Sequence, residues 1–212
     1  MSDTENTNLW SAAPEEAREV LDFWFGELDA QGRATEERSA RWFKKDPAFD
    51  EELRRRFGAL YEAISGEARQ DWLEEPWSRL AYVIVLDQFS RNMFRDTSEM
   101  FARDPQALAA ARGGVKAGQD RQLPRDPRTF IYMPLMHAED VAAQDRCVEL
   151  FAAMANEYEG EAQKALRRTL KYAVMHRDIV ARFGRFPHRN AVLDRESTAE
   201  ELAFLEQPNS SF

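Results

Sequence analysis

The densest group of chemically capable side chains in this chain lies in the segment HRDIVARFGRFPHRN, residues 176–190. Two of the three histidines fall in it, and its four arginines against one aspartate give it a net charge of +3 in a protein whose total is −9. Arginines bind carboxylates and phosphates through paired N–H donors, and a histidine can exchange a proton near neutral pH. We therefore expect this segment to contribute to a site for a small anionic molecule.

A second mixed segment, LDQFSRNMFR at residues 86–95, follows directly on the most apolar stretch of the chain. On a helix, Asp87 and Arg91 would lie four residues apart on one face, as would Gln88 and Asn92. An ion pair at this place would be partly removed from water, which is costly unless further hydrogen bonds complete it. The pair is therefore either a structural clamp or a preorganised site, and the sequence leaves both open.

The third histidine lies in FIYMPLMHAED, residues 130–140. His137 would share the apolar stripe of a continuous helix, where it is either a satisfied core histidine or an acid/base group that Asp140 could orient. Pro134 either kinks one helix or starts another, and we favour a restart, which would put Glu139 in a first turn, where the helix dipole favours an acid. We predict that the three segments meet around one pocket.

In the first segment, Gly184 should end a helix and leave the residues after it on a turn, where functional side chains are common. His176 should face inward, which favours a structural role. A basic helix terminus is the competing explanation, because arginines near a helix C-terminus favour its dipole whether or not a ligand binds. The expected acid/base groups are His137 and His188, with Asp87 and Glu139 as orienting partners, and the expected anion ligands are Arg91, Asn92, Arg182, Arg185, Arg189 and Asn190.

Composition limits the partners. With 43% apolar and 11% aromatic residues and no composition break, we expect a single all-helical domain over residues 1–212, with an ordered core at about 10–206 and flexible ends. The net charge of −9 opposes general binding to nucleic acid or anionic lipid, so we expect neither as a partner. The N-terminus lacks an export signal and no apolar run approaches the ~20 residues of a membrane span, so we expect a cytoplasmic protein. The oligomeric state is left open.

The sequence offers no sign of a metal or an organic cofactor. Cys147 is the only cysteine, which excludes an internal disulfide, and its apolar setting favours a small buried side chain over a nucleophile. No two histidines have the close spacing of metal ligands, and neighbouring arginines would repel a cation. Nucleophile elbows, phosphate-binding glycine loops and dinucleotide fingerprints are absent. If the protein is an enzyme, we expect a cofactor-independent hydrolase or transferase.

Helical periodicity runs through most of the chain and no hairpin signal interrupts it, which predicts the all-α class with about eight to ten helices. Three Asp-Pro pairs, at residues 46, 104 and 126, each place a capping acceptor before a proline and predict three helix starts. The predicted helices include residues 14–27, a pattern following residue 35, 47–65, a central helix at 77–94, 104–116, 161–183 and a short last helix after a capping box formed by Ser197 and Glu200.

The three mixed segments, in this order and followed by ESTAEELAFL, closely resemble the signatures of the bacterial domain of unknown function 924 family. The resemblance spans roughly residues 15–206 and implies an all-helical fold of the tetratricopeptide-like type. It implies no established activity. The alternative function is therefore a helical scaffold that binds a protein or peptide without catalysis, in which the same polar residues brace the helices internally.

Overall fold

The computed structural model describes residues 9–208, 210 and 211, and most of them lie in helices that follow one another along the chain. These residues contain no strand, only an isolated β-bridge between Leu28 and Ala34, so the predicted all-α class is confirmed. The α-helices are α1 Glu15–Trp24, α2 Glu36–Arg41, α3 Pro47–Ser65, α4 Pro76–Val83, α5 Ser90–Met93, α6 Asp104–Lys116, α7 Arg125–His137, α8 Val141–Asn156, α9 Gly160–Phe183 and α10 Ala199–Leu205. The shorter turns are η1 Gln70–Glu74, η2 Ile84–Phe89, η3 Ser98–Phe101, η4 Asp120–Gln122 and η5 Pro187–Arg189.

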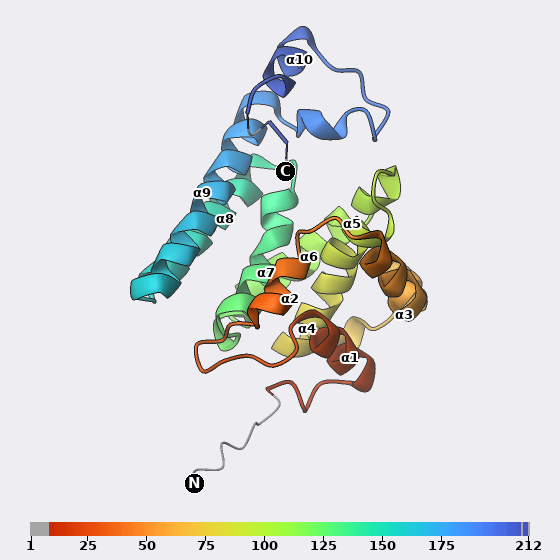
Figure 1. Cartoon of the computed structure of the whole chain (residues 1–212), viewed down its shortest axis with the longest axis vertical. Helices are drawn as coiled ribbons and strands as arrows, with labels where there is room; N and C mark the ends of the chain where they lie inside the picture. Colours follow the sequence, from red (N-terminus) through yellow and green to blue (C-terminus); the bar gives the residue numbers. More distant parts are fainter. Residues whose placement is uncertain (1–8, 209, 212) are drawn as a thin grey trace.

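Helices α1 to α7 form a body, α8 and α9 pack as a pair along one side of it, and the segment from η5 to α10 lies above the body at the far end of α9 (Figure 1). Aromatic rings fill the centre of the body. Trp24 meets Phe130 edge to face at 5.5 Å between ring centroids, and Phe57 packs against Phe89 at 4.9 Å. None of the helices in the described part of the chain is long and apolar enough to span a bilayer.

The three predicted Asp-Pro caps behave differently. Asp46 caps α3, since its carboxylate accepts from the backbone N–H groups of the next turn. All three predicted helix starts are confirmed, but the capping role is wrong for Asp104 and Asp126, which lie inside the first turns of α6 and α7. Their carboxylates bind partners that are distant in sequence, an arginine pair for Asp104 and the backbone N–H of Ala34 for Asp126. Because these tertiary contacts occupy both carboxylates, neither acid caps its helix.

The predicted helix restart at Pro134 is also wrong. Helix α7 continues through this proline to His137, and the break falls at the next residues, where Asp140 caps α8 by accepting from the N–H of Ala143 at 3.1 Å. A proline inside a helix costs a backbone hydrogen bond. Pro134, Leu135 and Met136 are buried, so packing compensates for that loss. Glu139 consequently lies in the loop between the two helices and not in a first turn.

The last capping box is displaced by one residue from its predicted place. Thr198 caps α10 and Glu201 completes the box, whereas the sequence predicted Ser197 and Glu200. The hydroxyl of Ser197 accepts instead from the side chain of Asn190 at 3.0 Å. The hydrogen bond from Asn190 thus engages Ser197, and the adjacent Thr198 caps the helix.

Two adjacent glycines in α6 make room for a buried arginine of α4. A Cβ atom on Gly114 would lie 2.7 Å from Cδ of Arg79, and one on Gly113 would lie 2.8 Å from its Nη1. Arg79 cannot move aside easily, because it is 8% exposed and donates hydrogen bonds to the carbonyl oxygens of Leu73 and Ala110 and to Gln119. The close approach of α4 and α6 therefore requires the absence of side chains here.

Gly114→Ala should destabilise the protein by about 1–3 kcal/mol, because the new methyl group overlaps a well-fixed side chain. Gly58→Ala in α3 is the matched control, since a Cβ there meets nothing within 4 Å and alanine favours the helix by about 0.5–1 kcal/mol. Urea unfolding of both variants gives the comparison. Equal stability of the two would contradict the close contact.

Candidate functional site

The central helix predicted at 77–94 is observed, but a π-helical turn, η2, interrupts it between α4 and α5. Such turns disturb the regular backbone ladder and are frequent at functional sites. Here three side chains of the segment LDQFSRNM return hydrogen bonds to carbonyl oxygens four residues earlier. Ser90 donates to Leu86 at 2.6 Å, Arg91 to Asp87 at 2.7 Å and Asn92 to Gln88 at 2.9 Å. The polar half of this motif thus stabilises the turn that holds Asp87.

The Asp87 carboxylate is completely buried and receives three donors. Its Oδ1 lies 2.7 Å from Nδ1 of His137 and 3.2 Å from Nη1 of Arg91, and its Oδ2 accepts from the Gln88 amide at 2.6 Å. Burial by itself would raise the pKa of Asp87, but Arg91 and His137 outweigh it and hold that pKa below its usual range. Asp87 is therefore an anion at neutral pH.

The network continues from Arg91 into α6 and on to η5. Arg91 binds the Asp104 carboxylate through both Nη atoms at 3.0 Å each, and Nη1 of Arg189 reaches the same carboxylate at 3.3 Å. His137, Asp87, Arg91, Asp104 and Arg189 therefore form one chain of contacts. It joins α7, the π-turn, α6 and η5, so the three mixed segments do meet in space.

Arg189 is the least satisfied member of this chain. Its guanidinium lies between two rings, 4.5 Å from the centroid of Phe101 and 4.4 Å from that of Phe186. The side chain is 7% exposed, and its buried Nε has no hydrogen-bond partner among the described residues. Burial, together with Arg91, lowers the pKa of Arg189 to about 10, which still leaves it charged at neutral pH. An anion bound here would add a partner for the buried Arg189 guanidinium, which otherwise shares the Asp104 carboxylate with Arg91.

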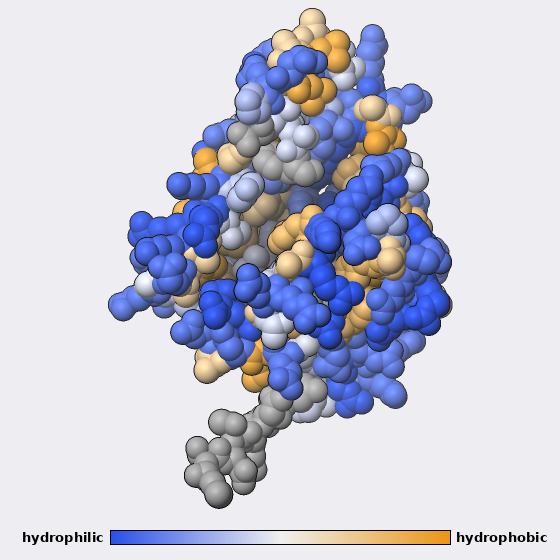
Figure 2. All heavy atoms as spheres, in the orientation of Figure 1, coloured by the Kyte–Doolittle hydropathy of each residue, from blue (hydrophilic) through white to orange (hydrophobic). Residues whose placement is uncertain are grey.

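Beside Arg189 lies a cleft of about 360 Å³. The surface is hollowed between the C-terminal part of the molecule at the top and the body below it (Figure 2). The cleft is lined by Ser98, Phe101, Ala102, Asp104, Pro105, Leu108, His137, Ala138, Glu139, Asp140, Arg189 and Leu193. Six of these residues are apolar and six are polar or charged, so the cleft combines apolar walls with several groups that can bind a polar ligand.

His137 is the titratable group of the cleft best placed for proton exchange. Its side chain is 12% exposed, and no described residue hydrogen-bonds to its Nε2. Burial and Arg91 lower the pKa of His137 despite the opposing effect of Asp87, so the ring is neutral at pH 7. A neutral ring that donates from Nδ1 to Asp87 carries its lone pair on Nε2. The dyad therefore offers an acceptor to the cleft.

The other two histidines lie beside this chain but do not line the cleft. His176 is buried in α9, its Nδ1 lies 2.8 Å from the carbonyl oxygen of Tyr172, and burial lowers its pKa to about 3. Burial and Arg189 lower the pKa of His188 to about 4. Both rings pack against Phe186, so they help to support the residue that stacks on Arg189.

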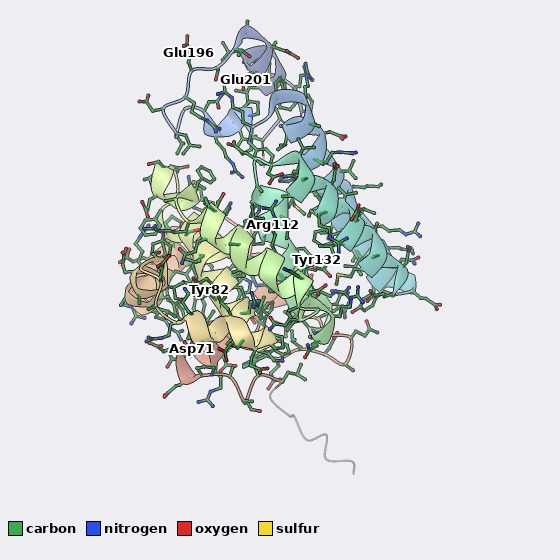
Figure 3. All side chains as sticks on the ribbon, turned by 180° about the vertical axis from the view of Figure 1, so that it is seen from behind. Asp71, Tyr82, Arg112, Tyr132, Glu196 and Glu201 are labelled. Carbon is green, nitrogen blue, oxygen red and sulfur yellow. The ribbon has the colours of Figure 1, made fainter. Side chains whose placement is uncertain are left out.

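A second polar network holds the C-terminal segment in place. Glu139 accepts two hydrogen bonds from Arg195, at 2.6 and 2.9 Å, and one from the backbone N–H of Phe186 at 2.8 Å. Arg185 binds both carboxylate oxygens of Glu201, which Asn190 also contacts. Glu201 lies with Glu196 at this end of the molecule, far from Tyr82 and Tyr132 in the body (Figure 3).

The structure therefore divides the predicted site residues. It brings Asp87, Arg91, His137, Glu139 and Arg189 to the cleft or directly behind it. Four others are engaged elsewhere: Arg182 with Glu200, Arg185 and Asn190 with Glu201, and Asn92 with Gln88 and Arg95.

Sequence reasoning missed Asp104, Phe101, Arg195 and Leu193. Asp104 carried a signal, an acid before a proline, but that signal pointed to a helix cap. The described residues contain no group of three or more His, Cys, Asp or Glu side chains arranged to hold a metal ion.

Comparisons with known proteins give a family but no activity. The family profile described as "Bacterial protein of unknown function (DUF924)" matches residues 20–209. A solved structure of a protein of unknown function from Agrobacterium tumefaciens is similar, with a TM-score of 0.75 and 40% sequence identity over 90% of this chain and 97% of that one. No curated protein matches the chain.

The buried His176 predicts a loss of stability in mild acid. Unfolded chains bind a proton at this residue below about pH 6.5, whereas the folded protein does so only near pH 3. The unfolded state is therefore stabilised relative to the folded state as the pH falls through this window. Between pH 7 and pH 5 the free energy of unfolding should fall by about 2 kcal/mol from this group alone. Urea unfolding at both pH values measures it, and His176→Gln should remove that part of the difference. An unchanged difference would mean that the folded protein already binds the proton.

Proposed function

This chain belongs to the bacterial family of unknown function 924, and we propose that it binds a small anionic molecule in the cleft beside Arg189. The observation that carries the proposal is the buried guanidinium of Arg189, whose Nε lacks a partner among the described residues. Arg189 lines the cleft, so a carboxylate or phosphate oxygen bound there would add a charge-assisted hydrogen bond to a guanidinium that is incompletely satisfied.

The surroundings of Arg189 fit a small ligand. A volume of about 360 Å³ lies within the range of small-molecule sites, towards its lower end. Phe101, Pro105, Leu108 and Leu193 supply apolar walls, while His137 places a proton acceptor in the same cleft. We infer that Arg189 anchors the anion and that Arg91 supports it through their common partner Asp104.

The dyad of His137 and Asp87 supports a catalytic role as well. A histidine oriented by a buried carboxylate is the arrangement that general acid/base catalysis uses, and no cofactor is needed for proton transfer. We propose hydrolysis or group transfer as the reaction class, with His137 exchanging the proton and Asp87 fixing its tautomer. Glu139 is assigned a supporting role, because Arg195 and the backbone of Phe186 occupy its oxygens.

The competing function is a scaffold for a protein or peptide. The ion pairs of Arg182 with Glu200 and of Arg185 with Glu201 favour it, since these arginines brace the end of α9 and the turn after it against α10. Exposed Tyr172 on α9 and Leu202 on α10 would be contact residues in that case. The two functions differ in what the cleft does, so a ligand test separates them.

Arg189→Gln should fold normally and lose its response to anions. A probe anion at 100 times its dissociation constant stabilises the wild type by about 2.7 kcal/mol, or roughly 5–10 °C, and the variant should show no shift. Thermal unfolding with hexanoate, benzoate, succinate and inorganic phosphate measures this. Arg182→Gln is the matched control, because Arg182 pairs with Glu200 outside the cleft, and it should respond as the wild type does. Loss of folded circular dichroism in Arg189→Gln would favour the bracing role of the scaffold.

His137→Gln should reduce turnover about 10²- to 10⁴-fold, the usual contribution of general acid/base catalysis, while the probe anion still binds through Arg189. Hydrolysis of p-nitrophenyl acetate, p-nitrophenyl butyrate and p-nitrophenyl phosphate provides the assay. Turnover that survives this substitution undiminished would remove His137 from the chemistry and leave a binding protein.

A further inference from the structure

We propose that the cleft takes up its anion together with one proton, which His137 receives at Nε2, and that its ligand is consequently a monoanionic carboxylate with a short apolar body. This inference rests on the proposed function and adds the charge state and chemical class of the ligand.

The charges around His137 balance one another. The charged groups that line the cleft, or that pair with its carboxylates or with Asp87, come from five places: the π-turn and α5, the start of α6, the loop between α7 and α8 with its partner on α6, η5, and the segment after η5. They are four cations, Arg91, Arg112, Arg189 and Arg195, and four anions, Asp87, Asp104, Glu139 and Asp140. His176 on α9 and His188 on η5 are neutral at pH 7. With His137 neutral, the site carries no net charge.

An entering anion disturbs this balance of charge. Each of the four anions already has an arginine partner, and Asp104 serves two. A monoanion would therefore leave one uncompensated negative charge between apolar walls, in a protein whose total charge is already −9. A dianion would leave two. Uncompensated charge in such a setting is unfavourable, so the site gains if it binds a proton at the same time.

His137 is the acceptor of that proton. His137 lines the cleft, and its Nε2 has no partner among the described residues. Asp87 stands 2.7 Å from the opposite nitrogen of the ring, ready to stabilise an imidazolium. In the empty site Arg91 and burial hold the ring neutral. An anion at Arg189 offsets the positive charge that opposes protonation, so it should raise the pKa of His137.

The apolar residues of the cleft indicate the chemistry of the ligand beyond its anionic group. Phe101, Pro105, Leu108, Ala138 and Leu193 present carbon surface, and the described residues that line the cleft include no second cation comparable to Arg189 for another anionic group. Arg112 and Arg195 are both engaged by the carboxylates of the loop between α7 and α8. A single carboxylate on a short aliphatic or aromatic body matches this surface best.

The consequence is a defined dependence of affinity on pH. The complex holds one proton more than its separated components, so affinity falls as pH rises. In the interval between the pKa of His137 without the anion, which lies below its ordinary value, and its higher pKa in the complex, the dissociation constant should increase about tenfold per pH unit.

Isothermal titration of the full chain with hexanoate and with benzoate tests this, at pH 6 to 8 and in two buffers of different ionisation enthalpy. The expected result is uptake of up to one proton per bound anion, with tighter binding of these monoanions than of succinate or inorganic phosphate. His137→Gln should bind the same monoanions with no proton uptake and no slope against pH. Arg182→Gln, the control, should behave as the wild type.

The outcomes separate the two proposals. Monoanion binding that depends on Arg189 but takes up no proton, or tighter binding of succinate or inorganic phosphate at pH 8, where both are mainly dianions, would overturn the coupled uptake and leave the proposed function standing. Proton uptake that persists in His137→Gln would overturn the assignment of His137. Absence of binding by all four probes to the wild-type protein would overturn both.

Discussion

A carboxylate that no solvent reaches must be matched by donors from the protein, and Asp87 imposes this requirement at the centre of the most apolar helix. His137 and Arg91 meet it, and each is thereby fixed in position. Arg91 in turn needs Asp104, and Asp104 attracts Arg189 from the opposite side of the cleft. The helices that surround the cleft are thus joined by a sequence of alternating charges that begins with one buried acid.

The C-terminal segment is attached to this arrangement by polar contacts more than by a common core. Among the described residues, Ile179, Val180 and Phe186 form a small apolar cluster distinct from the large one of the body. Glu139 ties the segment to the loop between α7 and α8 through Arg195. The two sides of the cleft therefore belong to separately packed units, which is a frequent location for ligand sites.

Sequence patterns predicted the helices well because apolar periodicity directly reflects burial. They also predicted that Asp87, Arg91 and His137 lie close together, since polar side chains within apolar segments need one another as hydrogen-bond and charge partners. They failed where a local signal and a distant partner competed, as at Asp104, where an apparent helix cap became a ligand of two arginines. No local pattern distinguishes Arg189, which lines the cleft, from Arg185, which binds Glu201, because the path of the turn after α9 decides between them.

The order of the cleft residues along the chain has a consequence for biosynthesis. The buried acid, the imidazole and the carboxylate of α6 all precede residue 141, whereas the guanidinium of Arg189 follows about fifty residues later. Because domains begin to fold as the chain emerges from the ribosome, the aromatic body can collapse around Asp87 while Asp104 still lacks its second arginine. The cleft is therefore completed late in translation, after the hydrophobic body that supports it has been made.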